Sequence, residues 1–471
     1  MKVEQIYTGC LAQGAYYIQS GNEVAIVDPL REVDAYIQKA EKNGATIKYV
    51  LETHFHADFV SGHLDLAKKT GAKIVFGPMA KPEYEIYSAQ DGEELVLGNT
   101  KIRVIHTPGH TMESTTFLLF DENGKEYAMF SGDTLFIGDV GRPDLAVKSD
   151  LTQEDLAGHL FESLKKLTVL PNDVIVYPGH GAGSACGKNM SKETFDSLGH
   201  QKEVNYALQP MSKEEFIAKV TEGLATPPYY FPQNVMMNKK GYQSFDNVMT
   251  NSMKGLSPDE FEMTAEAHEA LVLDTRDPDT FLEGFVPRSV NIGVNGDFAP
   301  WVGTLITDIK QPLLIVADDD KVEEVITRLA RIGYDNVLGY LKGGYEAWKA
   351  SGKEVDACEN LTAEEFEQRL KAEGDKAKVV DVRKKAENYS QHVLGSVWAP
   401  LAEINQNMEV YDANKTNYVH CAGGYRSAMA CSILKARGIH NIVNVKGGFK
   451  AIEQTGVPIS NYICASTMSQ L

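Results

Sequence analysis

Short apolar runs that end in Gly, Pro, His or Asp dominate residues 1–190. Their length and composition are typical of β-strands, and they read "EVAIVDPL", "IKYVLETH", "AKIVFGP", "TKIRVIHTPGH", "TTFLLF", "YAMFSGDTLF" and "DVIVYPGH". A helical stretch, "TQEDLAGHLFESLKKL", separates the last two runs, and Thr152 with Asp155 forms an acceptable N-cap signal. Because polar residues follow one strand after another, we predict packed sheets with a site along one sheet edge.

The periodic pattern weakens between residues 190 and 255. The stretch "LATPPYYFPQNVMMNKKGYQ" combines prolines with aromatic residues and lysines. A disordered linker would hold fewer aromatic residues, so we predict an ordered connector. The first domain is therefore placed at residues 1–255, connector included.

The remainder of the chain is an internal repeat. "LVLDTRDPDTFLEGFVPRSVNI" resembles "VVDVRKKAENYSQHVLGSVWAP", and "LKGGYEAWKASGKEV" resembles "VKGGFKAIEQTGVPI". The Lys-Gly-Gly motifs at Lys342 and Lys446 lie 104 residues apart, and the Asp-x-Arg motifs at Asp274 and Asp381 lie 107 apart. Strand–helix alternation then predicts two copies of one α/β domain, each with a largely parallel sheet, at residues 256–356 and 357–471.

Composition and charge restrict the partners. The chain of 471 residues carries a formal net charge of −19, which argues against a nucleic-acid partner because phosphate binding needs a basic face. An anionic substrate must be attracted by a metal or by individual arginines, since the overall field opposes it. No apolar stretch has the length of a signal region or a membrane span, which predicts a cytoplasmic protein without a membrane partner. Six cysteines are too few for a disulfide scaffold.

Histidines and one aspartate at strand ends point to a metal site. "LETHFHADFVSG" supplies His54 and His56, and "HTPGHT" supplies His110 in a Pro-Gly turn. "FSGDTLF" supplies Asp133, and "YPGHGAG" supplies His180. One histidine beside a turn is usually structural, but several that each end an apolar strand predict metal ligands. The histidines outside these motifs are interpreted as structural: His63, His106, His159 and His200.

The motifs "THFHAD", "TPGHT", "SGDTLF" and "YPGHG" resemble the ordered metal motifs of the metallo-β-lactamase fold. Such a resemblance implies an αββα sandwich with the metal in a groove at the sheet edges. "GCLAQGAYYI", "GDVGRPDL" and "GHGAGSACGK" further resemble persulfide dioxygenases of the ethylmalonic-encephalopathy type. Members of that family hold one Fe(II), and its ligands map by motif onto His54, His110 and Asp133. Two imidazoles and a carboxylate leave positions for water, a thiolate sulfur and O₂.

A two-metal zinc hydrolase is the alternative for the same domain. Glyoxalase II, which has this fold, hydrolyses a thioester with two metals and a bridging hydroxide. The last histidine of its metal loop binds the second metal, and this sequence has Phe59 there, without a donor atom. His56, Asp58 and His180 then either orient ligands and water, serve as further ligands, or persist as hydrogen-bonded structure.

Two further residues near the metal motifs have two interpretations each. Arg142 in "GRPDL" either holds an anionic group of the substrate or the sulfite product, or pairs with Asp144 to fix its loop. Cys186 in "HGAGSACGK" is either a packing residue or an exposed thiol that carries sulfur. Cys10 and Cys464 are interpreted as structural, and Cys358 as a linker residue.

The last repeat contains "VHCAGGYRSAMACSILKARG", which resembles the active loop of rhodanese sulfurtransferases, Cys-x-x-Gly-x-Arg. Its nucleophile would be Cys421, Gly423 and Gly424 would let the backbone curl around the sulfur, and Arg426 would add positive charge. Cys431, further along the helix, is assigned to the core. The first repeat has Ala317 where Cys421 stands, followed by three aspartates, and is predicted to be catalytically inactive.

Together these motifs predict a persulfide dioxygenase fused to a sulfurtransferase. The iron domain would oxidise a thiol persulfide with O₂ to sulfite, and Cys421 would move sulfane sulfur between persulfide, sulfite and thiosulfate in either direction. Tethering the two sites raises the local concentration of the shared intermediate. Two alternatives remain, a zinc thioester hydrolase with a sulfurtransferase tail and a non-oxidative sulfur carrier or sensor. The oligomeric state is open, with a homo-oligomer among the alternatives.

Overall fold

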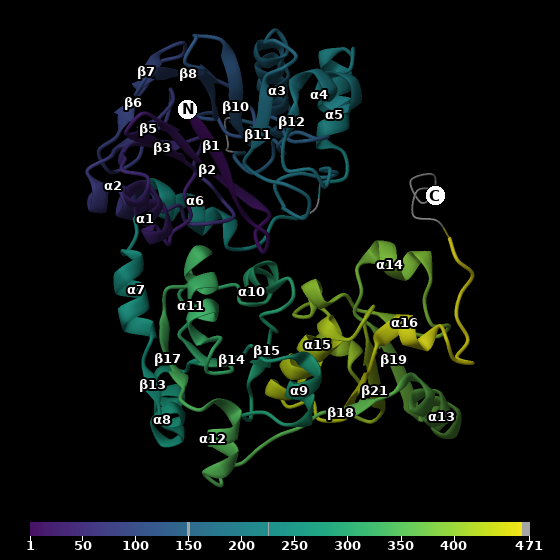
Figure 1. Cartoon of the computed structure of the whole chain (residues 1–471). Helices are drawn as coiled ribbons and strands as arrows, with labels where there is room; N and C mark the ends of the chain where they lie inside the picture. The colour runs from purple at the N-terminus through teal and green to yellow at the C-terminus, as the bar shows by residue number, and fades with distance from the viewer. Residues whose placement is uncertain (148–150, 225, 464–471) are drawn as a thin grey trace. The chain divides into compact units, whose positions relative to one another are not determined.

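The computed structural model describes residues 1–147, 151–224 and 226–463 (Figure 1). Cys464, interpreted above as structural, lies outside the described residues. The chain divides into two compact units: Met1–Val248 with Thr327–Tyr334 form the first, and the rest of the repeats forms the second. Within the described ranges, no helix combines the length and apolarity needed to cross a bilayer.

Two six-stranded sheets form the first unit. One has the order β1-β2-β3-β4-β5-β6 and the other β12-β11-β10-β9-β8-β7. The first sheet contains β1 (Lys2–Thr8), β2 (Gln13–Ser20), β3 (Glu23–Val27), β4 (Thr46–Glu52), β5 (Lys73–Phe76) and β6 (Tyr87–Ser88). The second contains β7 (Glu94–Leu97), β8 (Thr100–His106), β9 (Thr115–Phe120), β10 (Glu126–Gly132), β11 (Ile175–Pro178) and β12 (Asp196–Ser197).

Helices cover the outer faces of both sheets. Beside the first sheet lie α1 (Asp34–Lys42) and α2 (His63–Thr70). The second sheet shares its outer core with α3 (Gln153–Thr168) and α5 (Lys213–Thr221). The predicted αββα sandwich is therefore confirmed, and α3 begins with a full capping box between Thr152 and Asp155.

The two-residue period of a strand explains how both faces of the first sheet become buried. In β2, Tyr16 and Ile18 belong to the core between the sheets, together with Phe117 and Phe130 of the second sheet. Their neighbours Ala15 and Tyr17 point to the opposite face and pack under the helices. Successive side chains of a strand point to opposite faces, so one apolar run serves two cores.

The predicted connector is helical and ordered on both sides of residue 225, which lies outside the described ranges. It contains α4 (Leu198–Val204), the 3₁₀ turn η1 (Tyr206–Leu208), α5, α6 (Phe231–Lys240) and α7 (Phe245–Ser252). The aromatic residues Tyr230 and Phe231 are buried, which explains why this stretch forms structure despite its prolines. Pro232 lies in the first turn of α6, where its missing N–H costs nothing.

Two five-stranded parallel sheets with the same strand order make up the second unit. The orders are β13-β17-β16-β14-β15 and β18-β22-β21-β19-β20, and every described pairing is parallel, as predicted. The first repeat contains β13 (Gly255–Leu256), α8 (Pro258–His268), β14 (Leu271–Asp274), α9 (Pro278–Glu283), β15 (Val290–Asn291), α10 (Phe298–Leu305), β16 (Leu313–Val316), α11 (Val322–Arg331), β17 (Val337–Leu341) and α12 (Gly344–Ala350).

The second repeat follows the same plan. Its elements are β18 (Glu359–Leu361), α13 (Ala363–Glu373), η2 (Gly374–Lys376), β19 (Ala377–Asp381), α14 (Lys385–Ser390), β20 (Val397–Trp398), η3 (Leu401–Glu403), η4 (Met408–Val410), β21 (Thr416–His420), α15 (Tyr425–Ala436), β22 (Ile442–Val445) and α16 (Gly448–Ile452). In both repeats the Asp-x-Arg motif is a buried ion pair, with 2.6 Å between Arg276 Nη2 and Asp274 Oδ2 and 2.7 Å between Arg383 Nη2 and Asp381 Oδ2. These pairs stabilise the ends of β14 and β19, which agrees with their predicted structural role.

Candidate metal centre and sulfur-transfer site

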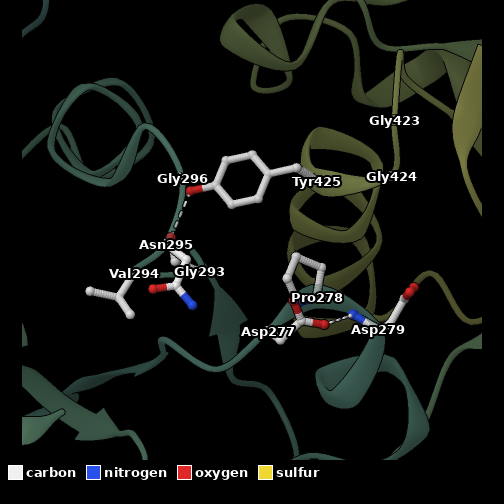
Figure 2. A pocket seen from close by; sticks show the side chains of 10 residues that line it. All are labelled: Asp277, Pro278, Asp279, Gly293, Val294, Asn295, Gly296, Gly423, Gly424 and Tyr425. Carbon is white, nitrogen blue, oxygen red and sulfur yellow. Dashed lines mark hydrogen bonds between the residues drawn. The ribbon is translucent and has the colours of Figure 1, made fainter. Parts of the chain in front are cut away.

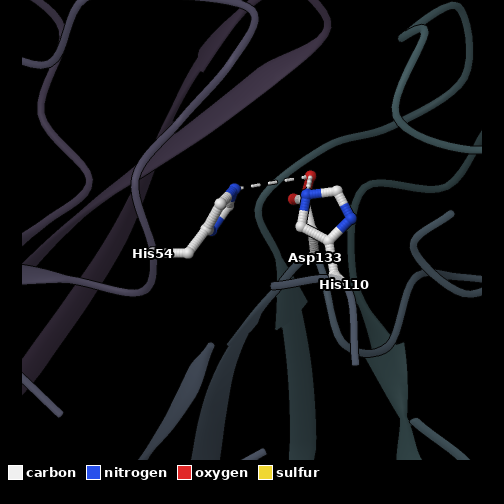
Figure 3. Close-up of side chains that lie close together, drawn as sticks. All are labelled: His54, His110 and Asp133. Carbon is white, nitrogen blue, oxygen red and sulfur yellow. Dashed lines mark ion pairs between the residues drawn. The ribbon is translucent and has the colours of Figure 1, made fainter. Parts of the chain in front are cut away.

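Three strand ends bring His54, His110 and Asp133 together (Figure 3). Asp133 Oδ2 lies 3.8 Å from His54 Nε2 and 3.5 Å from His110 Nε2. His54 follows β4 of one sheet, whereas the other two follow β8 and β10 of the other sheet. All three side chains are buried. The three ligands predicted from the motifs therefore converge where the two sheets meet.

Hydrogen bonds fix the tautomer of both histidines. His110 Nδ1 lies 2.8 Å from the Arg142 carbonyl oxygen, which can only accept, so Nδ1 carries the proton. His54 Nδ1 contacts the Thr53 hydroxyl at 2.9 Å, and that hydroxyl donates to Asp28 Oδ2 at 2.8 Å. Thr53 therefore accepts from His54 Nδ1–H. Each Nε2 keeps a lone pair directed toward the cluster, which is the form that binds a metal.

The donor set fits a divalent transition metal. His54 Nε2 and Asp133 Oδ2 are buried and have no hydrogen-bond partner among the described residues, so both atoms are available to a bound group. Burial and the neighbouring His56 hold the pKa of His54 well below its ordinary value, so the imidazole is neutral. Burial opposes ionisation of Asp133, but His180, His54 and His110 outweigh it and hold the pKa of that carboxyl far below normal. Both groups are thus in the protonation state that binds a metal.

The other polar residues near the cluster contact Asp133, one another or nearby buried carboxylates. His180 Nδ1 lies 2.8 Å from Asp133 Oδ1, and its Nε2 lies 2.7 Å from Asp58 Oδ2. His56 Nε2 lies 3.1 Å from Asp28 Oδ1 and points into a buried carboxylate pair with Glu52. Asp133 is therefore bound through one oxygen by His180 and presents the other to His54 and His110.

Phe59 occupies the position of the missing histidine. It is fully buried, and its ring centroid lies 4.3 Å from that of His56. A phenyl ring packed there offers no ligand atom and excludes water from that side of the loop.

Cys186 is buried rather than exposed, which favours the packing interpretation. Burial together with Asp58 and Asp133 raises the pKa of its thiol well above the ordinary value. It lies beside Asp58 and His180, with the three ligand atoms within 4.8 Å of one another. Packing of the glycine-rich loop against the domain buries the sulfur, and a protonated thiol is a weak nucleophile.

Arg142 forms the ion pair that was one of its two interpretations. Its guanidinium donates to both carboxylate oxygens of Asp144, at 2.6 Å each, and to the Ala185 carbonyl oxygen at 3.1 Å. Its own carbonyl orients His110. The structure therefore shows the Arg142 backbone positioning His110, while binding of a substrate anion by the Arg142 guanidinium stays a prediction.

Asn238 is a positioning residue that the sequence did not reveal. It lies on α6, in the connector, and its Nδ2 donates to the carbonyl oxygens of His56 and Phe59, each at 2.8 Å. The Ser61 N–H donates to its Oδ1 at 2.9 Å. One buried side-chain amide thus holds three residues of the loop that follows β4, although it lies about 180 residues away in the sequence. No pattern in the sequence around Asn238 identifies this role.

The predicted sulfur-transfer loop connects β21 to α15. Cys421 is buried, and its Sγ accepts the Gly424 N–H at 3.1 Å and lies 3.5 Å from the Ser427 hydroxyl. Gly424 has a φ of +107°, which an L side chain rarely adopts. The loop therefore directs a backbone donor at the sulfur from the start of a helix, as anion stabilisation requires.

Arg426 lies beside this loop with its charge already paired. Its Nη1 and Nη2 donate to Glu387 at 2.6 and 2.7 Å. This bidentate pair holds the guanidinium rigidly in place but offsets the positive charge that the motif predicted. The Gly424 N–H and the Ser427 hydroxyl therefore contact Cys421 Sγ directly.

The residues at and after the Lys446 Lys-Gly-Gly motif contact the backbone of the loop that contains Cys421. The Phe449 N–H donates to the Cys421 carbonyl oxygen at 2.6 Å, and the Lys450 N–H donates to that of Ala422 at 3.1 Å. Gly448 has a φ of +57°, and a Cβ there would lie 2.4 Å from the Cys421 oxygen. The residues that follow the motif, which was predicted as a scaffold element, thus hold the backbone of Cys421 directly.

We expect Gly448→Ala to destabilise the second repeat by about 1–3 kcal/mol, because it combines a left-handed φ with a backbone collision. Gly438→Ala is the matched control, since Gly438 also has a positive φ, +84°, but meets nothing within 4 Å. Thermal unfolding midpoints and sulfurtransferase rates measure the difference. Equal midpoints for the two variants would contradict the collision.

The first repeat has the same support but no nucleophile. Ala317 follows β16 and is buried, and a Cβ added at Gly344 would lie 3.1 Å from its carbonyl oxygen. Asp319 Oδ1 accepts the Gly343 N–H at 3.2 Å, so an aspartate occupies this loop. A methyl group cannot carry sulfur, and neighbouring carboxylates repel anions, which supports the predicted inactivity.

Family models match all three parts of the chain. Residues 8–180 match the metallo-beta-lactamase superfamily, and residues 257–351 and 362–455 each match the rhodanese-like domain. The chain is 30% identical to a metallo-beta-lactamase from Staphylococcus aureus subsp. aureus COL; the alignment covers 73% of this chain and 98% of that one, with a TM-score of 0.64. The chain belongs to the metallo-β-lactamase superfamily and continues into two rhodanese-like domains.

Two curated relatives match about a third of this chain. A probable hydroxyacylglutathione hydrolase of Schizosaccharomyces pombe is 35% identical over 34% of this chain and 59% of its own length. A hydroxyacylglutathione hydrolase of Brucella anthropi is 38% identical over 30% of this chain and 50% of its own length. The chain thus spans between half and three fifths of the curated relatives it matches.

Proposed function

We propose that this chain is a persulfide dioxygenase with one non-haem iron, fused to a sulfurtransferase whose nucleophile is Cys421. It would oxidise low-molecular-weight thiol persulfides to sulfite and move sulfane sulfur between persulfide, sulfite and thiosulfate. The observation that carries the proposal is the buried group of three ligand atoms from His54, His110 and Asp133, beside a loop that holds Phe59 in place of a further histidine.

The contacts around this group support one metal rather than two. Asp133 Oδ1, the oxygen that a second metal would share, lies 2.8 Å from His180 Nδ1. Asp58 pairs with the other nitrogen of His180, His56 lies against Asp28, and Phe59 has no donor atom. Asp58 and His180 therefore lie against one another, and Phe59 offers no donor atom to a second metal.

Balanced oxidation of the persulfide consumes one O₂ and one water, giving RSSH + O₂ + H₂O → RSH + SO₃²⁻ + 2H⁺. The sulfane sulfur loses four electrons, and O₂ accepts them. An Fe(II) ion held by the three side chains would supply the redox chemistry and open positions for sulfur and O₂. The protein orients His54 and His110 through the Thr53 hydroxyl and the Arg142 carbonyl oxygen, and it buries the site against bulk water.

Sulfur transfer uses the second repeat. The Cys421 thiolate attacks the outer sulfur of a persulfide, the S–S bond breaks, and the thiol leaves with the electron pair. Sulfite then attacks the outer sulfur of the Cys421 persulfide, releasing thiosulfate and regenerating the thiolate. The Gly424 N–H stabilises negative charge at Cys421 in each step. The reverse sequence, starting from thiosulfate, uses the same contacts.

A thioester hydrolase is the second candidate, and the curated relatives favour it. One is named a probable hydroxyacylglutathione hydrolase and the other a hydroxyacylglutathione hydrolase, and they are 35% and 38% identical to this chain over the aligned residues. Zinc suits the same His, His, Asp donor set. The two candidates differ in metal, in metal count and in their need for O₂.

Metal analysis and substrate turnover distinguish the candidates. We expect about one iron per chain, O₂ uptake that requires glutathione persulfide, and no hydrolysis of S-lactoylglutathione. Two zinc ions per chain with thioester hydrolysis would favour the hydrolase. A protein that takes up no O₂ with any thiol persulfide would sink the dioxygenase.

A further inference from the structure

A cavity of about 370 Å³ lies between the two repeats, next to the Cys421 loop (Figure 2). We call it the inter-repeat pocket. Its lining comes from three segments, Asp277–Asp279 and Gly293–Gly296 of the first repeat and Gly423–Tyr425 of the second. Gly424 links the pocket to the nucleophile, because its N–H donates to Cys421 Sγ.

The inactive repeat is fastened to the catalytic loop at this pocket. Tyr425, the first residue of α15, reaches across the pocket and its hydroxyl donates to the Gly293 carbonyl oxygen at 2.8 Å (Figure 2). Gly296 is needed beside it, since a Cβ there would lie 2.3 Å from the tyrosine ring. On the next turns of α15, the Ser432 hydroxyl accepts the Asn291 N–H at 2.9 Å. The first repeat therefore supplies a fixed wall for the site although it lacks a nucleophile.

The charges of this wall favour one class of substrate. The lining has two aspartates and neither lysine nor arginine. Asp279 is offset by Lys446 at 3.3 Å, whereas Asp277, whose side chain is exposed, forms no ion pair within the described part of the chain. Sulfite and thiosulfate are anions, so the lining residues offer them no electrostatic attraction. An ammonium group, by contrast, would be attracted to the Asp277 carboxylate.

We propose that the inter-repeat pocket binds the organic part of a small thiol that carries an ammonium group, and that Asp277 recognises this group. The inference rests on the proposed sulfurtransferase role of Cys421 and specifies its organic substrate. The thiolate RS⁻ attacks the outer sulfur of the Cys421 persulfide, the S–S bond breaks, and the electron pair leaves on Cys421, giving RSSH after protonation. The volume suits a small organic molecule, at the lower end of ligand pockets.

Three thiols of similar size test the charge preference: cysteamine, 2-mercaptoethanol and 3-mercaptopropionate. Thiosulfate serves as sulfur donor, and sulfite release by the full-length protein is measured. We expect Asp277→Asn to raise the KM for cysteamine about two- to fivefold, the range of an exposed ion pair, and to leave the KM for 2-mercaptoethanol unchanged. Asparagine retains the side-chain oxygen that caps α9, so the fold is preserved.

Asp277→Lys provides a second variant, which we expect to shift the preference toward 3-mercaptopropionate. Asp375→Asn, an exposed aspartate of η2 outside the pocket, is the matched control and should change no KM. Equal changes for all three thiols, or none in either Asp277 variant, would overturn the inference while leaving Cys421 as nucleophile. Absence of sulfite release from the wild type with every thiol would instead overturn the sulfurtransferase assignment, and this inference with it.

Discussion

Cys421→Ser is expected to lower sulfurtransferase activity by about 10³-fold or more, the loss typical of removing a nucleophile. A serine hydroxyl cannot hold a sulfane sulfur, although it can still accept the N–H of Gly424 that now contacts the thiol. The fold should therefore survive. Persulfide-dependent O₂ uptake should continue, because the ligands of the metal centre belong to the other unit.

Cys431→Ala is the matched control for this variant. Cys431 lies on α15 and is fully buried, and its contact with Cys358, together with burial, raises the pKa of its thiol well above normal. We expect the variant to retain most of the sulfurtransferase rate. Thiosulfate formation from sulfite and persulfide by Cys421→Ser at the wild-type rate would contradict the assignment of the nucleophile.

His110→Ala is expected to remove the metal and with it the O₂ uptake. The change deletes one of three ligand atoms and leaves the Arg142 carbonyl oxygen, which now accepts from His110 Nδ1, without its partner. Loss of a group that hydrogen-bonds to a metal ligand weakens metal affinity about 10- to 100-fold. Loss of a ligand itself should weaken metal affinity further. Metal content per chain, measured after dialysis, should fall to a small fraction of the wild-type value.

His106→Ala is the control for His110→Ala. His106 ends β8 only four residues earlier, but its Nε2 contacts the Met112 carbonyl oxygen at 2.8 Å and takes no part in the ligand group. We expect normal metal content and O₂ uptake from this variant, and normal sulfurtransferase activity from both. Full metal content in His110→Ala would show that the metal lies elsewhere.

The two substitutions also test whether the centres work independently. If Cys421→Ser retains oxidation and His110→Ala retains sulfur transfer, each centre can run without the other. Their products then report the direction of sulfur flow. Sulfite should accumulate in Cys421→Ser when thiosulfate formation is the main direction, because the consumer of sulfite is missing.

Local patterns in the sequence predicted much of this molecule. The parallel sheets of the repeats followed from strand–helix alternation and from the spacing of the Asp-x-Arg and Lys-Gly-Gly motifs, and the αββα sandwich followed from the resemblance of the metal motifs. Strand ends supplied the candidate metal ligands, and the resemblance selected His54, His110 and Asp133 among them. In a sheet, the ends of neighbouring strands meet at one edge, so strand-end residues gather without further information.

Contacts between distant segments could not be predicted in this way. Asn238 on α6 holds the metal loop through three hydrogen bonds, although its own surroundings in the sequence carry no signal. Cys186 had two interpretations, and packing buries it beside Asp58 and His180. Arg426 was expected to present its charge, but it is paired with a carboxylate, as Arg142 is.

The sequence by itself supplied the candidate residues: histidines and an aspartate after strands, and a cysteine in a glycine-rich loop before a helix. Residue type and position within one element gave these candidates, and resemblance to known motifs selected His54, His110, Asp133 and Cys421 among them. Tertiary structure alone decided the protonation, exposure and charge of these groups, and it gave the inactive repeat a place beside Cys421 through Tyr425 and Gly293. Burial and ion pairing depend on which segments pack together, and that is a property of the whole fold.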